Sequence, residues 1–115
     1  MERAAMRVAG VGFRSGAGAK PLRQAVASVG QVDALATARE KAEELAAALP
    51  DYRVIGVTVA GVDTPAQSER VRALKGTGSV AEAAALVAAG KGARLVLPRQ
   101  VIGGVVLAVA EGEDE

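Results

Sequence analysis

The chain has 115 residues, half of them hydrophobic, and Phe13 and Tyr52 are its only aromatic residues. This length suits one domain with a core of Ala, Val and Leu. The sequence holds neither Cys nor His, which excludes disulfides, thiolate zinc sites, cysteine nucleophiles and a Ser-His-Asp triad within the chain.

The net charge of +1 at pH 7 is unevenly distributed. Residues 111–115 hold four of the thirteen acidic groups, so residues 1–110 carry fourteen basic and nine acidic groups, a net charge of +5. A basic body suits an anionic ligand, and ordinary surface charge explains it equally well. We expect one domain over residues 1–110 and a solvated, disordered acidic tail over residues 111–115.

Nucleic acid, membranes and metals are not expected as partners. The sequence has no dense basic run and too few aromatic residues to stack bases. Its apolar runs fall short of the ~18 residues of a membrane span, and residues 1–7 do not resemble a signal peptide, so we expect a cytoplasmic protein. Without His and Cys we expect no bound metal and no resident cofactor. Nothing in the sequence indicates an oligomeric state.

The first half of the chain alternates strand and helix patterns. Residues 6–13 are predicted to form a buried strand. After the loop of residues 14–18, apolar residues at i, i+3, i+4 and i+7 predict a helix that stops at Gly30. Residues 32–36 are predicted as a short strand, and Thr37-x-x-Glu40 is a capping box for a helix bounded by Pro50. Residues 53–59 are the third predicted strand.

The second half holds two predicted helices followed by two strands. Residues 64–74 can form a short helix. The loop of residues 75–78 leads into a helix over residues 80–89, with Ser79-x-x-Glu82 as its capping box. Residues 93–97 and 104–110 are predicted strands, and because the connector between them is short, we expect an antiparallel pair.

This order of elements predicts a three-layer α/β domain with a mostly parallel sheet and a C-terminal antiparallel strand pair. In such sheets ligands bind beyond the carboxyl ends of the strands. Three loops should therefore meet at one rim, namely residues 13–18, 37–41 and 75–79.

The third of these loops has the composition of an anion site. Glycines on either side of Thr77 precede a predicted helix, whose first N–H groups favour an anion the size of phosphate or carboxylate. The binding candidates here are Gly76, Thr77, Gly78 and Ser79. Ser79 and Glu82 could instead only cap the helix. Glu82 is also the one catalytic candidate, as a general acid or base.

The first loop adds a cation and small residues. Arg14 suits a bidentate contact with a carboxylate, or it is a solvated loop arginine. Gly12, Ser15 and Gly16 are candidates to contact the ligand through their backbones. Gly10-x-Gly12 also resembles a dinucleotide fingerprint, but the sequence has no glycine at the third position and no acid at the end of the second strand.

The second loop contributes Thr37 and Lys41. Thr37 is a ligand candidate or only a cap, and Lys41 points either to the rim or to solvent. Arg99 and Gln100 lie in the last predicted connector, which could sit at either end of the sheet.

Four ordered blocks, spanning residues 8–110, resemble one protein family. Residues 10–17 resemble its opening Gly-x-Gly-Cys-Arg block, with Phe13 where Cys is usual, and residues 35–43 resemble its second block. Residues 76–86, with the sequence GTGSVAEAAAL, are similar to its most distinctive block, and residues 95–100 resemble its Pro-Lys-Gln ending. The chain thus resembles the CobE / CbiG C-terminal domain family of cobalamin (vitamin B12) biosynthesis.

This resemblance implies an α/β fold and work on a corrinoid precursor, which carries many carboxylates. Full-length CbiG-like proteins open the ring-A δ-lactone of cobalt-precorrin-5A and release acetaldehyde. The chain resembles only their C-terminal domain and is closer to stand-alone CobE, so we expect it to bind, protect or hand over a corrinoid or precorrin intermediate. One alternative is a subunit of a lactone hydrolase that needs a separate N-terminal-type partner. Another is a non-catalytic scaffold for other cobalamin-pathway enzymes.

Overall fold

The computed structural model describes residues 6–58, 79–90 and 92–112. Within these residues the chain forms, in order, β1 (Met6–Gly12), α1 (Ala19–Ser28), β2 (Ala34–Ala38), the 3-10 turn η1 (Arg39–Lys41), α2 (Ala42–Ala48), β3 (Val54–Val57), α4 (Ser79–Ala89), β4 (Arg94–Ile102) and β5 (Val105–Gly112). The predicted helix over residues 64–74 and the loop of residues 75–78 lie outside the described residues. No helix in the described ranges is long and apolar enough to cross a membrane.

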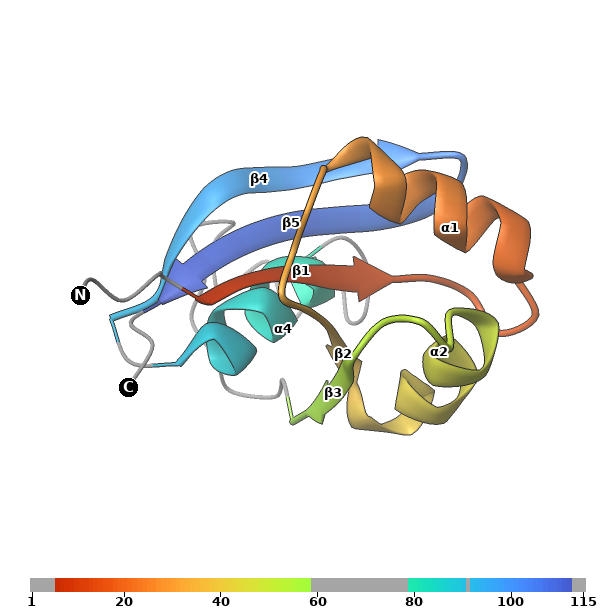
Figure 1. Cartoon of the computed structure of the whole chain (residues 1–115), viewed down its shortest axis with the longest axis horizontal. Coiled ribbons are helices and arrows are strands. Elements are labelled where there is room, and N and C mark those ends of the chain that lie inside the picture. The colour runs from red at the N-terminus through yellow and green to blue at the C-terminus, as the bar shows by residue number, and fades with distance from the viewer. Residues whose placement is uncertain (1–5, 59–78, 91, 113–115) are drawn as a thin grey trace.

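The described strands form one five-stranded sheet in the order β3-β2-β1-β5-β4 (Figure 1). β1 pairs with β2 and β2 with β3 in parallel, whereas β5 pairs antiparallel with both β1 and β4. Four strands therefore run in one direction and β5 runs against them. This arrangement confirms the predicted α/β fold with its C-terminal antiparallel pair.

Helices cover both faces of the sheet. α1 and α2 pack on one face over a core of Leu and Val side chains that includes Leu22, Leu45 and Leu107. α4 packs on the other face, where the buried residues are mostly alanines, among them Ala36, Ala84 and Ala110. The predicted three layers are therefore present (Figure 1).

The α4 face is built for close approach between helix and strands. A Cβ atom at Gly10 of β1 would overlap the carbonyl oxygen of Ala81, and one at Gly112 of β5 would overlap that of Ala89. The helix backbone thus lies directly on these two glycines. Small side chains on both layers explain how a chain with few large apolar residues closes a second core.

Three sequence expectations need correction. The predicted capping box at Thr37 is wrong, because Thr37 lies inside β2, its side chain is buried, and η1 begins after Ala38 with no side-chain cap. A β-branched residue between buried neighbours is better placed in a strand than at a helix end. The second predicted strand consequently starts and ends two residues too early.

The predicted connector of residues 98–103 is also wrong, because β4 continues through Pro98 to Ile102. Proline is tolerated there since β4 is the edge strand, where one side of the backbone has no partner strand in the described sheet. The turn is instead Gly103-Gly104, whose φ angles of 58° and 83° suit a two-residue hairpin.

The first two residues of the predicted disordered tail, Glu111 and Gly112, lie in a strand. β5 continues through Glu111 and Gly112, and Glu111 pairs with Arg7 of the neighbouring strand at 3.0 Å. Residues 111 and 112 therefore belong to the sheet, while residues 113–115 lie outside the described residues.

Candidate functional site

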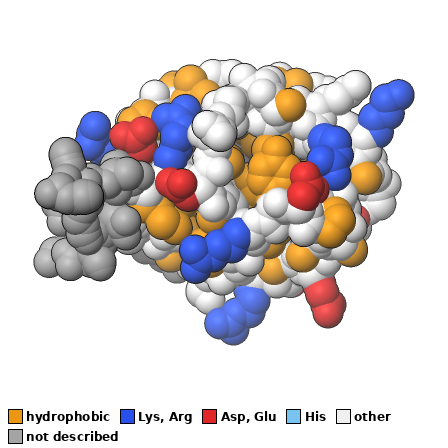
Figure 2. All heavy atoms as spheres, viewed as in Figure 1, with side chains coloured by type: hydrophobic (Ala, Val, Ile, Leu, Met, Phe, Trp, Pro, Cys, Tyr) orange, Lys and Arg blue, Asp and Glu red, His pale blue; other side chains and the backbone are white. Residues whose placement is uncertain are grey.

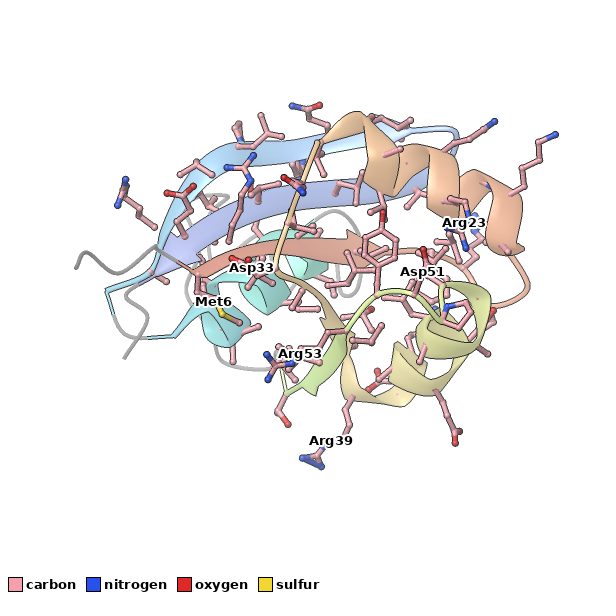
Figure 3. The ribbon with its side chains drawn as sticks, viewed as in Figure 1. Met6, Arg23, Asp33, Arg39, Asp51 and Arg53 are labelled. Carbon is pink, nitrogen blue, oxygen red and sulfur yellow. The ribbon has the colours of Figure 1, made fainter. Side chains whose placement is uncertain are left out.

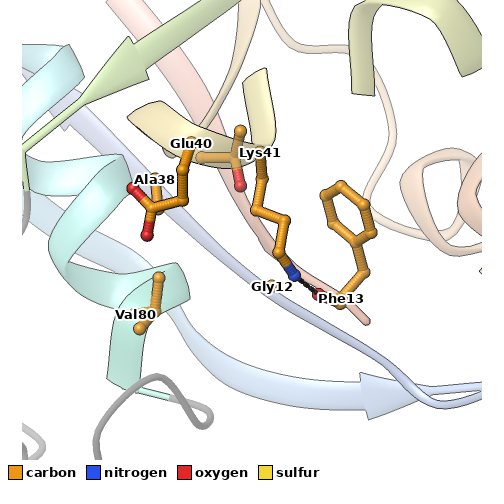
Figure 4. Close-up of a pocket in the computed structure, with 7 residues that line it drawn as sticks. Gly12, Phe13, Ala38, Glu40, Lys41 and Val80 are labelled. Atoms are coloured by element: carbon orange, nitrogen blue, oxygen red, sulfur yellow. Dashed lines mark hydrogen bonds between the residues drawn. The ribbon is translucent and has the colours of Figure 1, made fainter. Parts of the chain in front are cut away.

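The carboxyl ends of β1 and β2 and the first turn of α4 enclose a pocket of about 200 Å³. We call it the rim pocket, and Figure 4 shows it. Its lining residues are Gly12, Phe13, Thr37, Ala38, Glu40, Lys41 and Val80. Parallel pairing of β1 with β2 brings Gly12 and Phe13, at the end of β1, next to residues 37–41, at the end of β2. The packing of α4 on β1 adds Val80. The pocket lies where a sheet of this kind is expected to bind ligands.

Lys41 is fixed at the wall of the rim pocket. Its Nζ donates a hydrogen bond of 2.6 Å to the carbonyl oxygen of Phe13 and lies 4.9 Å from the centre of the Phe13 ring. The side chain is half-buried. The carbonyl oxygen and the ring face both favour a cation, so the ammonium is held beside the end of β1.

Thr37 is a buried lining residue of the rim pocket. Its side chain is only 1% exposed, and its hydroxyl donates a hydrogen bond of 2.8 Å to the carbonyl oxygen of Val11. This bond ties the last residues of β2 to those of β1. The role of Thr37 in the geometry is therefore to hold two strand ends together.

Glu40 places a negative charge in the same pocket. It lies at the opposite side of the pocket from the Lys41 ammonium (Figure 4), and neither residue takes part in an ion pair among the described residues. The pocket thus offers one fixed cation and one separate carboxylate.

The first predicted rim loop, residues 13–18, divides after Phe13, which lines the pocket. Gly12 lines the pocket, whereas Arg14, Ser15 and Gly16 are exposed and do not line it. The N–H of Gly16 donates a hydrogen bond of 2.6 Å to Glu44 of α2. This bond anchors the loop to α2 and occupies a donor that the sequence offered to a ligand.

Of the third predicted loop, Gly76, Thr77 and Gly78 lie outside the described residues. Ser79 is the first residue of α4, and its neighbour Val80 lines the rim pocket.

Glu82 is buried in the first turn of α4 and does not line the rim pocket. Its side chain is 3% exposed, and Oε2 accepts a hydrogen bond of 3.1 Å from the N–H of Arg99 in β4. Oε1 accepts no hydrogen bond from any described residue. The described contact of Glu82 therefore joins α4 to β4 next to a register irregularity of that strand.

The topology places Arg99 and Gln100 at the carboxyl edge of the sheet. β4 runs in the same direction as β1, and the pairs Val101 with Val106 and Val106 with Gly12 align its end with the end of β1. Both side chains are exposed. The sequence did not determine at which end of the sheet Arg99 and Gln100 lie. The structure places them toward the end that carries the rim pocket.

Four pocket residues were not among the predicted site residues: Phe13, Ala38, Glu40 and Val80. Phe13 and Glu40 lie inside the two loops predicted at the rim, so proximity along the chain could have found them. Val80 becomes a wall only through the close packing of α4 on the sheet, which no local pattern indicates.

Charges elsewhere on the surface are interspersed and do not gather into one basic region on the face in Figure 2. Arg23 of α1 and Asp51, in the segment between α2 and β3, point toward one another (Figure 3), with two hydrogen bonds of 3.1 and 3.2 Å. These bonds lower the pKa of Asp51 and raise that of Arg23.

The chain is thus an α/β domain with a pocket at the carboxyl ends of parallel strands, the place where domains of this class commonly bind small molecules. Residues 7–110 match the family model described as Cobalamin synthesis G C-terminus. The chain therefore belongs to the CobE/CbiG C-terminal family of cobalamin biosynthesis proteins, which confirms the resemblance seen in the sequence.

Two solved structures are similar to the chain. The cobalamin biosynthesis protein chiG from Agrobacterium tumefaciens str. C58 is 35% identical with a TM-score of 0.64, over 95% of this chain and 100% of that one. CobE, a protein from the cobalamin (vitamin B12) biosynthetic pathway, is 26% identical with a TM-score of 0.68, over 100% of this chain and 96% of that one. A comparison with curated proteins found no match.

Proposed function

We propose that this protein binds a polycarboxylate corrinoid or precorrin intermediate at the carboxyl edge of its sheet. The observation that carries the proposal is the Lys41 ammonium, held at the wall of the rim pocket with donors left over for a ligand. Membership in a cobalamin biosynthesis family supplies the ligand class. Corrin precursors bear acetate and propionate arms, whose carboxylates suit fixed cations and N–H donors.

The site in this proposal has an inner and an outer part. The inner part is the rim pocket with Gly12, Thr37 and Lys41. The outer part comprises exposed residues near the carboxyl ends of the strands, namely Arg14, Ser15, Gly16, Arg99 and Gln100. The proposal adds the sequence candidates Gly76, Thr77, Gly78 and Ser79 to this outer part.

A hydrolase subunit that works with a separate partner is the second candidate. It is favoured by the family match to a C-terminal region and by the presence of a carboxylate, Glu40, and an ammonium, Lys41, in one pocket. A carboxylate can accept a proton and an ammonium can donate one, so the pair could serve as general base and general acid. In both candidates other enzymes of the pathway are the expected protein partners.

A visible-absorbance titration of the full chain with hydrogenobyrinic acid tests the proposal. We expect a saturable spectral shift at micromolar protein, and absorbance that stays constant after mixing if the role is binding alone. A continuing spectral change would favour the enzyme. No shift at any concentration would overturn direct binding.

Two arginine variants locate the ligand on the sheet. Arg14 follows the carboxyl end of β1, whereas Arg53 precedes β3 at the amino edge, and both are exposed. We expect Arg14→Ala to weaken binding a few-fold, since an exposed ion pair contributes about 0.2–1 kcal/mol, and Arg53→Ala to leave it unchanged. The reverse order would contradict binding at the carboxyl edge.

A further inference from the structure

The rim pocket is too small for the whole ligand that we propose for this site. Its volume is about 200 Å³, whereas pockets that enclose a drug-sized ligand measure about 300–1,000 Å³, and a macrocycle with its side arms is larger still. We infer that the pocket takes one carboxylate-bearing side arm while the ring stays outside, and that Lys41 selects the free acid over its amide. This inference rests on the proposed function.

Lys41 has donors to spare for such an arm. An ammonium group carries three N–H donors, and one of them already donates to the carbonyl oxygen of Phe13 at 2.6 Å. The other two can donate to the oxygens of a carboxylate in the pocket. A carboxylate accepts hydrogen bonds from the ammonium and also attracts it as an opposite charge, whereas a carboxamide only accepts the hydrogen bonds. A carboxamide at the same place loses this advantage.

The remaining walls suit the methylene groups of a short arm. Phe13, Ala38 and Val80 line the pocket with apolar surface beside the single ammonium. An acetate or propionate arm has this same division, with one or two methylene groups behind a charged end. A long or branched polar group would leave its polar atoms against these walls, at a cost in affinity.

Glu40 limits the pocket to one acid. Its carboxylate lies on the other side of the pocket from the Lys41 ammonium (Figure 4). A second ligand carboxylate directed to that side would meet a like charge, which disfavours it. The residue also weakens the field of Lys41, so its neutralisation should strengthen the binding of an acidic arm.

The test compares two macrocycles that differ in their side arms. Dicyanocobyrinic acid carries free carboxylates, and dicyanocobinamide carries amides on the same ring with the same metal. We expect calorimetric titration to show that the protein binds the acid roughly tenfold to a hundredfold more tightly, because only the acid adds an attraction between opposite charges to its hydrogen bonds with Lys41.

Three variants assign this preference. Lys41→Met keeps the aliphatic stem and should reduce the preference severalfold, whereas Lys20→Met removes the same charge from the exposed start of α1 and should preserve it. Glu40→Gln should tighten binding of the acid a few-fold. Because the Lys41 and Glu40 variants are expected to act in opposite directions, a general loss of folding cannot produce both results.

Each outcome decides between the two claims. If the wild-type protein binds the acid and Lys41→Met binds it equally well, the inference is wrong and the proposed function stands. Equal binding of the acid and the amide would also overturn the inference. If neither macrocycle binds, the proposed function fails together with it.

Discussion

Gly10 of β1 offers a direct test of how closely α4 packs on the sheet. In Gly10→Ala the new Cβ atom would overlap the carbonyl oxygen of Ala81 and lie 2.9 Å from the N atom of Ala85. Both are main-chain atoms inside a helix, so they cannot turn aside as the end of a flexible side chain can. The variant can fold only if α4 moves away from the sheet as a unit.

The expected loss of stability follows from this contact. Overpacking a core costs about 1–3 kcal/mol and occasionally more, and a clash with main chain belongs at the upper end of that range. The restriction of the unfolded chain by Ala offsets about 0.4–1 kcal/mol where the native backbone accepts the residue. We therefore expect Gly10→Ala to lose about 2–2.5 kcal/mol of unfolding free energy, which lowers the Tm by roughly 8–10 °C for a domain of this size.

Gly12 supplies the matched control, because it lies on the same strand and the same face two residues further on. A Cβ atom at Gly12 would lie 3.6 Å from Cβ of Val106, an ordinary contact. Gly12→Ala should stay within about 1 kcal/mol of the wild-type protein. Urea unfolding followed by far-UV circular dichroism measures both variants in a chain that has no Trp. Equal stability of the two variants would refute the close packing of α4.

Three further substitutions test contacts around the site, each by urea unfolding. Glu82→Gln keeps an oxygen that can accept the N–H of Arg99, so it should stay within about 1 kcal/mol of the wild-type protein, whereas Glu82→Ala loses the acceptor and should cost about 2 kcal/mol; equal losses would show that the bond is unimportant. Thr37→Val leaves a β1 carbonyl without its donor and should cost about 1–2 kcal/mol, and no loss would mean that water replaces the hydroxyl. Asp51→Asn breaks the bond to Arg23, which lowers the pKa of Asp51 in the folded state. The stabilisation is therefore present above the ordinary pKa of about 4 and disappears as the pH falls through the lowered value, so the wild-type protein should exceed the variant in stability at pH 7 and match it in strong acid.

The sequence predicts best where one local signal determines an element. The apolar spacing before Gly30 places α1, and the alanine-rich run before Gly90 places α4 to within a residue. Prediction from the sequence fails where pairing between strands far apart in the chain determines the secondary structure. Thr37 satisfies a capping pattern locally, yet its pairing with Gly56 of β3 makes it part of a strand. Pro98 normally interrupts a strand, and only the position of β4 at the edge of the sheet explains why the strand continues through it.

The candidate site, too, could be predicted where a local rule applies and could not where long-range contacts decide. The rule that ligands bind at the carboxyl ends of parallel strands was sufficient to select two of the loops that line the rim pocket. It could not separate Lys41, which lines the pocket, from Gly16, whose N–H is occupied by Glu44 twenty-eight residues away. Contacts of that range depend on how α2 packs against the loop, and no spacing along the chain encodes them.

Gly10 and Gly12 explain why the rim pocket lies where it does. The two glycines look like one motif in the sequence, but α4 lies on the first and leaves the second free of the helix. Gly10 lets the helix approach until its first turn reaches the end of β1, which brings Val80 to the pocket. Gly12 then adds no side chain to the space between Val80 and the end of β2. A Gly-x-Gly pair that resembles a phosphate-binding fingerprint therefore serves helix packing at one position and the opening of a pocket at the next.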